Sequence, residues 1–234
     1  MTQPPMVTTR WLFSCEHGGR SVPDEYADLF RGAGAVLASH RGWDAGALDV
    51  FAALSPALGD AGFPATITRL LVDLNRSLHH PRVFSEFTRP LPPAARADIA
   101  ARWWRPWRAS VAATIAGWLE GGQAVQHISV HSFTPVLGTD IRNADIGLLY
   151  DPARARELAF CLRWQALLAA RGWRVRRNYP YRGTDDGHTP ALRRRFGVGY
   201  AGIELEINQA LLPRLLEPLC VDLGETLAEL KARP

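Results

Sequence analysis

Apolar and polar positions alternate along this chain in two periods, and together they predict an alternating series of strands and helices. Short apolar runs predict strands, and longer stretches with apolar residues three or four apart predict helices. The expected strands are residues 10–15, 65–73, 125–131, 144–150, 173–178 and 200–207. The expected helices are residues 44–60, 93–120, 153–171 and 212–232. Strand–helix alternation of this kind predicts an α/β protein with a mostly parallel sheet covered on both faces.

Prolines, loop-forming residues and tryptophans add detail to the predicted strands and helices. Pro106 and Pro218 are expected to kink or break the helices that contain them, because proline lacks an N–H and clashes with the preceding turn. The segments 77–92 and 178–199 are rich in proline, glycine and arginine, which predicts loops of the kind that often border a site. The tryptophans of the helix at 93–120 recur at helical spacing. They are therefore expected to face the core rather than to stack on nucleic-acid bases.

Length and composition are those of an ordinary globular domain. The 234 residues are 47% hydrophobic and 21% charged, and we expect one domain spanning residues 1–234. No apolar run approaches the ~20 residues of a membrane span. The start of the chain, residues 1–5, has no basic segment followed by an apolar stretch, so no secretory signal is expected. The three scattered cysteines, Cys15, Cys161 and Cys220, form no disulfide framework, and a cytoplasmic location is predicted.

The charge balance bears on possible partners. The formal net charge is +4, and Lys231 is the only lysine among the basic residues. Apart from Arg174–Arg177 and Arg193–Arg195, the arginines are dispersed, so no nucleic-acid partner is expected. An arginine that faces a ligand suits a carboxylate, since its planar fork matches the two oxygens. We therefore expect an anionic small molecule as the partner, and the sequence leaves the oligomeric state open.

Two of the predicted strands end in histidine. His17 follows the first strand and precedes two glycines, and His131 ends the strand at 125–131. Taken singly, each has an alternative interpretation as a histidine that is simply hydrogen-bonded within the core. Because open α/β sheets bind ligands at the carboxyl ends of their strands, the recurrence of this context favours a shared site.

Asp44 is the candidate for a third ligand. It could simply cap the helix that follows it. As a ligand it would complete a set of two histidines and one carboxylate, which is the usual shape of a catalytic zinc site. His40, four residues earlier, could replace Asp44 or orient it, and Ser132 beside His131 is a second candidate for orienting a ligand.

Glu204 and Glu206 supply candidate acid–base groups. Two residues apart in a strand, they project from the same face. If that face meets the site, one of them can take a proton from a metal-bound water as general base. The alternative is a pair of solvent-exposed carboxylates on an edge strand.

Several polar residues are candidates for binding an anionic substrate. Each of the arginines could equally be a salt-bridge partner. The candidates are Arg69, Asn75, Arg76, Arg142 and Arg182.

Some common catalytic motifs are missing from the sequence. It contains no G-x-S-x-G, G-x-x-x-x-G-K-[ST] or H-E-x-x-H pattern. Residues 197–202 match G-x-G-x-x-G, but they run into the expected strand at 200–207 instead of joining a strand to a following helix, as the dinucleotide-binding motif does. This disfavours a standard serine hydrolase, a phosphate-loop NTPase and a Rossmann dehydrogenase.

An ordered set of motifs resembles the N-formylglutamate amidohydrolase family from about residue 10 to 212. The motifs are Ser14-Cys15-Glu16-His17-Gly18-Gly19, Trp43-Asp44-Ala45-Gly46-Ala47, Thr68-Arg69-Leu70, Asp73-Leu74-Asn75-Arg76, Val130-His131-Ser132-Phe133, Asn178-Tyr179-Pro180-Tyr181-Arg182-Gly183 and Glu204-Leu205-Glu206-Ile207-Asn208. Family members commonly have serine where this chain has Thr68. The stretch from Arg182 to His188 is similar to a variant subgroup.

The resemblance implies a fold and a set of roles. The family is similar in fold to the zinc carboxypeptidases and the zinc-dependent N-acetylmuramoyl-L-alanine amidases, which implies a three-layer α/β/α sandwich with a mixed, mainly parallel sheet. It implies that His17, Asp44 and His131 bind one zinc ion. The pattern of a glutamate two residues before Asn208 assigns the catalytic role to Glu206 ahead of Glu204.

The implied function is zinc-dependent hydrolysis of the amide in a small N-formyl or N-acyl amino acid by metal-activated water. Arg142 or Arg69 is then expected to pair with the substrate carboxylate. Two other hypotheses stay open on the sequence alone. One is an amidase acting on a larger amide such as a cell-wall peptide, and the other is a non-catalytic basic module that binds nucleic acid.

Overall fold

The structure is a computed structural model and describes residues 8–232. Residues 1–5, on which the expectation about a secretory signal rests, lie outside the described residues. Six strands form one sheet in the order β2-β1-β3-β8-β6-β7. The strands are β1 (Thr9–Cys15), β2 (Ala61–Pro64), β3 (Ala124–Phe133), β6 (Ile146–Leu149), β7 (Val175–Arg177) and β8 (Tyr200–Asn208).

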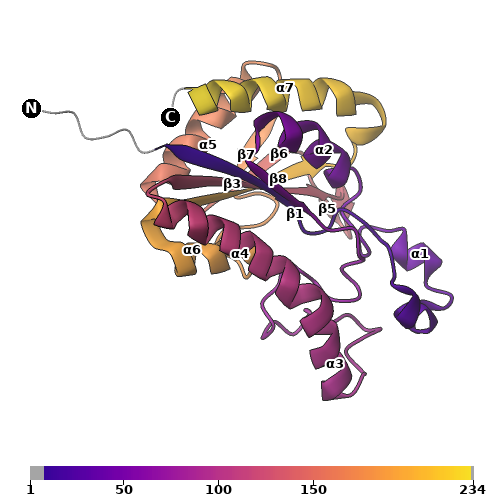
Figure 1. Cartoon of the computed structure of the whole chain (residues 1–234). Coiled ribbons are helices and arrows are strands. Elements are labelled where there is room, and N and C mark those ends of the chain that lie inside the picture. The colour runs from indigo at the N-terminus through magenta and orange to yellow at the C-terminus, as the bar shows by residue number, and fades with distance from the viewer. Residues whose placement is uncertain (1–7, 233–234) are drawn as a thin grey trace, which may run out of the picture.

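Helices cover both faces of this sheet, as Figure 1 shows. One layer consists of α2 (Ala47–Leu58), α5 (Ala155–Ala169) and α7 (Leu212–Ala232), and the other contains α4 (Arg105–Glu120) and α6 (His188–Phe196). Within this six-stranded sheet of the described residues, β6 and β8 pair antiparallel and all other neighbours pair parallel. The α/β/α sandwich with a mixed, mainly parallel sheet is confirmed. None of the described helices combines the length and the hydropathy needed to cross a membrane.

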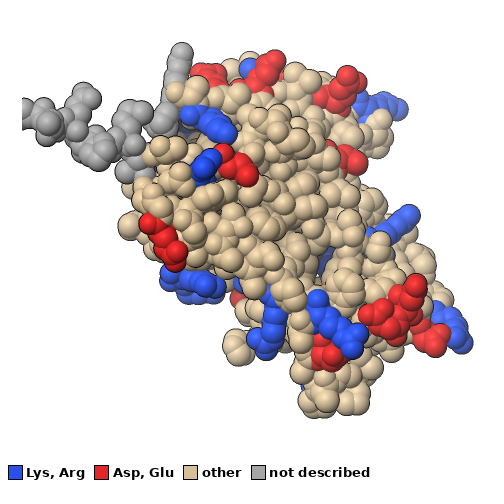
Figure 2. Space-filling model, viewed as in Figure 1, with Lys and Arg blue, Asp and Glu red and all other residues tan. Residues whose placement is uncertain are grey.

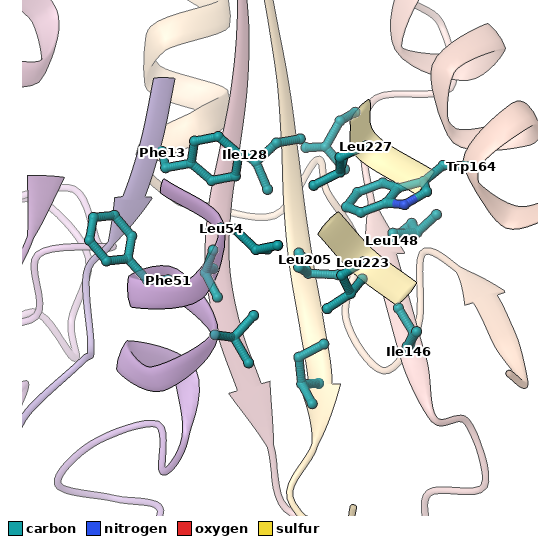
Figure 3. Close-up of a cluster of buried hydrophobic side chains, with 14 of the residues drawn as sticks. Phe13, Phe51, Leu54, Ile128, Ile146, Leu148, Trp164, Leu205, Leu223 and Leu227 are labelled. Carbon is teal, nitrogen blue, oxygen red and sulfur yellow. The ribbon is translucent and has the colours of Figure 1, made fainter. Parts of the chain in front are cut away.

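The larger core lies between the sheet and the layer of α2, α5 and α7. Phe13, Ile128 and Leu205 project from three adjacent strands onto this face and are fully buried (Figure 3). They pack against Trp164 of α5 and Leu223 of α7, among others. Because side chains alternate across a strand, the residues between these apolar ones face the opposite helix layer. Those residues are largely polar, and they lead to the site described below.

The predicted strand at 65–73 is wrong. The strand beside β1 is β2, residues 61–64, and the segment after it turns away from the sheet. Pairing with β1 ends at Pro64, the register partner of the last β1 residue, Cys15, and the N–H of Ala65 still donates to the oxygen of Cys15 before the chain leaves the sheet. The apolar residues that suggested a strand pack instead in a separate small cluster with residues such as Phe30 and Ile99. The segment is apolar because it is buried, and not because it is a strand.

The helix predicted at 44–60 begins later than expected. Its first residue is Ala47 and its N-cap is Gly46, so the interpretation of Asp44 as the N-cap is wrong. Gly46 has a φ of 77°, and a Cβ there would lie 2.4 Å from a side-chain carbon of Leu212. The left-handed φ favours glycine, whereas the end of the Leu212 side chain could shift to make room for a Cβ. The turn leaves the Asp44 side chain free to face the sheet.

Neither Pro106 nor Pro218 breaks the helix that contains it. The helix predicted at 93–120 consists of α3 (Pro93–Ile99), a π-helical turn (Ala100–Trp104) and α4. The π-helical turn comes directly before Pro106, a position where an irregular turn accommodates proline. Pro218 lies inside α7, which continues to Ala232.

Several short elements had not been predicted. The most consequential is α6, which lies in the segment 178–199 that had been expected to be a loop. Its sequence is only nine residues long, contains a proline and three consecutive arginines and is strongly hydrophilic, so it offers few apolar positions that would mark a helix. The other unpredicted elements are η1 (Asp24–Phe30), α1 (Gly34–Leu37), β4 (Val136–Leu137), β5 (Asp140–Ile141) and η3 (Gly197–Gly199).

Candidate metal centre

A cleft of about 690 Å³ opens at the carboxyl ends of β1, β3 and β8. Eleven of the twelve residues that the sequence proposed for the site line this cleft, and Arg142 is the exception. The eleven are His17, His40, Asp44, Arg69, Asn75, Arg76, His131, Ser132, Arg182, Glu204 and Glu206.

His17, Asp44 and His131 meet at the floor of this cleft. One ligand atom from each residue lies within 4.8 Å of the other two. Oδ2 of Asp44 is 2.9 Å from Nδ1 of His131 and 3.3 Å from Nδ1 of His17. The two imidazole rings are 5.1 Å apart between centroids. All three residues are buried, although they are far apart in the sequence.

The outer nitrogens of both histidines are held by other side chains. Nε2 of His17 is 2.7 Å from Oδ1 of Asp73, and this nitrogen donates because a carboxylate can only accept. Nε2 of His131 is 2.9 Å from Oγ of Ser129, whose own hydroxyl donates to Glu16. With both Nε2 atoms engaged in this way, the Nδ1 atoms are the ones that face Asp44 and are left to bind a metal.

Two imidazole nitrogens and one carboxylate oxygen thus converge on one point, where they can share a proton or a metal ion. The charges of His17 and His131 hold the pKa of Asp44 well below its ordinary value despite its burial. Burial would lower the pKa of His131, but its hydrogen bond to Asp44 and the charge of Glu16 raise this pKa to about 10. Two imidazole nitrogens and one carboxylate oxygen are a fitting ligand set for a divalent ion such as zinc.

Glu206 lies beside His131 with one free oxygen. The two residues are register partners on β8 and β3. Oε2 of Glu206 is buried and has no hydrogen-bond partner among the described residues. Burial and the charges of Asp44 and Glu204 raise the pKa of Glu206 to about 8. Glu204 shares the same face but accepts a hydrogen bond from Thr189, which leaves Glu206 as the freer carboxylate.

A buried polar network behind the metal centre was missed by the sequence analysis. Glu16, which is 1% exposed, accepts hydrogen bonds from the hydroxyls of Ser14 and Ser129 and from Nδ1 of His188. His127 extends the network by donating to Ser14. The pKa of Glu16 lies well below its ordinary value, because these hydrogen bonds and the neighbouring histidines outweigh burial.

The sequence held a signal for one member of this network. Glu16 is a charged residue directly after an apolar strand, which is a costly position unless the charge is paired. His188 gave no such signal, since it lies in the helix that had been expected to be a loop. Asp73 belongs to one of the quoted motifs, but nothing in the sequence indicated that it contacts His17.

The candidate substrate-binding arginines differ in how many ion pairs and hydrogen bonds they already form with other protein groups. Arg69 contacts Asp44 at 3.3 Å and Asp73 at 2.8 Å. Arg76 donates to the backbone oxygen of Asp186. The guanidinium of Arg182 forms no ion pair with any described residue, and it is the one most available to a ligand.

Arg142 is placed outside the cleft lining. It is 5% exposed and donates to the hydroxyl of Tyr181, a residue that does line the cleft. The two residues proposed to orient a ligand also differ. Ser132 donates to the backbone oxygen of Ala45 and thereby holds the turn that carries Asp44. His40 is exposed at the rim and forms no hydrogen bond to Asp44 within the described part of the chain.

The fold and the site define an α/β/α protein with a buried group of side chains that could hold a metal ion at the carboxyl edge of its sheet. Residues 9–212 match the model of the family described as N-formylglutamate amidohydrolase. This match covers most of the chain, and the chain therefore belongs to the N-formylglutamate amidohydrolase family. The resemblance proposed from the sequence motifs is confirmed.

Two solved structures are similar over nearly their whole length. A gene product of Agrobacterium tumefaciens is 27% identical, with a TM-score of 0.79 over 96% of this chain and 93% of that chain. The N-formylglutamate amidohydrolase of Ralstonia eutropha is 17% identical, with a TM-score of 0.72 over 98% of this chain and 95% of that chain, and this likeness shows the fold alone. No curated protein sequence matches the chain.

Proposed function

We propose that this protein is a metal-dependent amidohydrolase that cleaves the amide of a small N-formyl or N-acyl amino acid. The observation that carries the proposal is the convergence of His17, Asp44 and His131 beside the unpartnered oxygen of Glu206. Family membership supports hydrolysis of an amide bond. The ligand set supports zinc as the metal, and zinc bound there would supply an activated water and polarise the amide carbonyl.

Glu206 is the proposed general base. Its free Oε2 takes a proton from the attacking water and later gives this proton to the departing amine. A raised pKa suits both steps, because a carboxyl group near neutrality can hold and release a proton. Glu204, which is held by Thr189, keeps its place beside Glu206 and raises the pKa of Glu206 by its charge.

Arg182 is our first candidate for the substrate carboxylate, with Arg76 and Asn75 beside it in the cleft. Its guanidinium lies free at the cleft wall and can pair with a carboxylate through two parallel hydrogen bonds. Arg69 is proposed to hold Asp44 and Asp73 in place. Arg142 is proposed to act through Tyr181, whose hydroxyl it fixes.

The location and partners of the protein also remain proposals. The three cysteines are all free, which supports a reducing compartment such as the cytoplasm. Acidic and basic side chains are interspersed over the face shown in Figure 2, which supports a small-molecule substrate rather than a nucleic acid.

The test combines metal analysis with a substrate screen. Protein purified without added metal should carry about one tightly held divalent ion per chain. Amine release from N-formyl and N-acetyl amino acids should occur, stop after a chelator and return when zinc is added. A metal-free protein without amidase activity would overturn the proposal. Release from cell-wall peptides alone would indicate the larger-amide alternative, and strong salt-dependent DNA binding without metal would indicate a nucleic-acid module.

A further inference from the structure

A second hollow lies in the helix layer formed by α4 and α6. It has a volume of about 370 Å³, and none of its lining residues belongs to the cleft of the metal centre. Its polar lining consists of Trp104, Arg105, Arg108, His188 and Arg195. We call this hollow the α4–α6 pocket. Basic side chains stand out along the lower edge of this layer in Figure 2.

The three arginines of the α4–α6 pocket have no acidic partner. Arg108 donates to the backbone oxygen of Leu74 at 3.0 Å, and its guanidinium lies 4.6 Å from the ring centre of Trp104. These contacts fix its position without neutralising its charge. Neither it nor Arg105 or Arg195 forms an ion pair with any residue in the described range 8–232. Three like charges around one hollow repel each other, and a bound anion would relieve that repulsion.

His188 adds a different requirement. Its side chain is 1% exposed, and its Nδ1 donates to Glu16 at 3.0 Å. Because Nδ1 donates to Glu16, Nε2 of the neutral ring is an acceptor, and burial, which lowers the pKa of His188, favours this neutral ring. This Nε2 is buried and has no partner among the described residues. A buried acceptor without a partner is costly and is satisfied by a ligand that brings its own donor.

We propose that the α4–α6 pocket is a second binding site, for a small oxyanion that also carries a hydrogen-bond donor. The three guanidinium groups would hold the oxyanion, and His188 would accept its O–H. Hydrogen phosphate has this chemistry, and so does a 2-hydroxy acid. Sulfate and a simple carboxylic acid have the charge but lack the donor.

The test uses two matched pairs of probes and the protein as purified. Isothermal titration calorimetry would compare phosphate with sulfate, and lactate with propionate, at pH 7.5. We expect saturable binding at one site per chain, with at least one donor-bearing probe binding about tenfold tighter than its partner. A preference within the phosphate pair assigns the site to phosphate, and a preference within the lactate pair assigns it to a hydroxy acid. Equal binding of both members in both pairs would overturn the proposal.

Two double variants locate the site. Arg105→Ala with Arg195→Ala removes two exposed charges from the α4–α6 pocket, and binding should weaken about tenfold or more. Arg82→Ala with Arg89→Ala removes the same charge from the rim of the other cleft and should leave binding unchanged. Weakening only in the second variant would place the anion in the cleft. Weak binding that neither variant changes would mean an adventitious ion only, and both outcomes refute a site at the α4–α6 pocket. No step of this test requires amide hydrolysis, so it stands apart from the proposed function.

Discussion

The two faces of the central strands are equally buried but differ in almost every other property. On β3, Val130 is 0% exposed and His131 only 2%, and on β8 Leu205 is 0% exposed and Glu206 only 5%. Val130 and Leu205 belong to the large apolar core, whereas His131 and Glu206 face the opposite helix layer and the cleft. A strand in which apolar and polar residues alternate usually has one face in water. Here helices cover both faces and the polar face meets solvent only at the cleft, so its polar residues must be explained by their chemistry.

The comparison of the two faces indicates that the apolar face supplies stability, whereas the polar face supplies the residues of the candidate site. Apolar burial contributes about 25 cal/mol per Å² and favours folding wherever it occurs. Polar groups gain little from burial and are tolerated only when hydrogen-bonded. Glu16 meets this condition by accepting from Ser14, Ser129 and His188, whereas Oε2 of Glu206 has no partner among the described residues. We therefore expect substitutions on the apolar face to change stability, and substitutions on the polar face to change metal binding and catalysis.

The largest effect is expected for His131→Ala. Two ligands remain after this change, which is one fewer than catalytic zinc sites use, so bound metal and amidase activity should both be lost. The fold should be kept, because the apolar face is untouched. Metal content after gel filtration and the circular dichroism spectrum measure the two outcomes. The control is Val130→Ala, which should keep the metal and lose about 2 kcal/mol of stability. A His131→Ala variant with a full complement of metal would remove this residue from the site.

Glu206→Gln should lower kcat/KM by about a thousandfold, because the glutamine side chain cannot take a proton from the attacking water. Metal content and melting temperature should stay close to those of the unchanged protein. Glu204→Gln is the matched control, and its effect should be much smaller because Glu204 already accepts from Thr189. Full turnover by Glu206→Gln would refute its role as general base.

Leu205→Ala tests the apolar face of β8. Leu205 lies between Glu204 and Glu206 in the sequence, but its side chain points to the other side of the sheet. Leu205 is fully buried in the larger core, so its truncation leaves a cavity. We expect a loss of about 3 kcal/mol in the free energy of unfolding and a fall of about 10 °C in melting temperature. Below that temperature kcat/KM should change by less than about twofold. Urea unfolding and steady-state kinetics at 25 °C measure both. A large loss of activity in a folded Leu205→Ala variant would mean that the two faces are not independent.

The sequence predicted the strand ends well because each carried a polar residue next to an apolar run. His17, His131 and Glu206 were selected in this way, and the structure brings them to one cleft. Asp44 was ambiguous, because an aspartate before a helix is also a common N-cap. Only Gly46, whose positive φ starts the helix at Ala47, excludes that interpretation.

The wrong and the missed predictions share one physical cause. In each case a residue is buried or makes its contact through tertiary packing, which the pattern of strands and helices does not reveal. Residues 65–73 are apolar because they fill a small core, and sequence periodicity cannot distinguish such a loop from a strand. Asp73 lies in the same segment, and the path of that loop brings it next to His17, so the contact between the two side chains depends on tertiary structure. His188 depends in the same way on α6, a helix too short and too basic to be recognised.

Asp73→Asn should weaken metal binding without abolishing it. Asparagine keeps an oxygen that can accept from Nε2 of His17, but it lacks the charge that makes the imidazole a stronger ligand. We expect the dissociation constant for zinc to rise about 10–100-fold, measured by competition with a chromogenic chelator. Asp185→Asn, at the exposed rim of the cleft, should bind zinc like the unchanged protein. Equal affinity in both variants would show that Asp73 does not support His17.

The smallest expected effect concerns the three thiols, two of which lie in the apolar core. Cys15 and Cys161 are fully buried, and burial raises the pKa of each well above its ordinary value. Cys220 is half-buried, and its pKa is raised as well. Because only the thiolate reacts, a disulfide reagent should modify one thiol per folded chain, and the rate should rise with pH beyond the range seen for free cysteine. The other two thiols should react only after denaturation. Rapid modification of all three at neutral pH would show that the apolar layer opens easily, which contradicts its assignment as the source of stability.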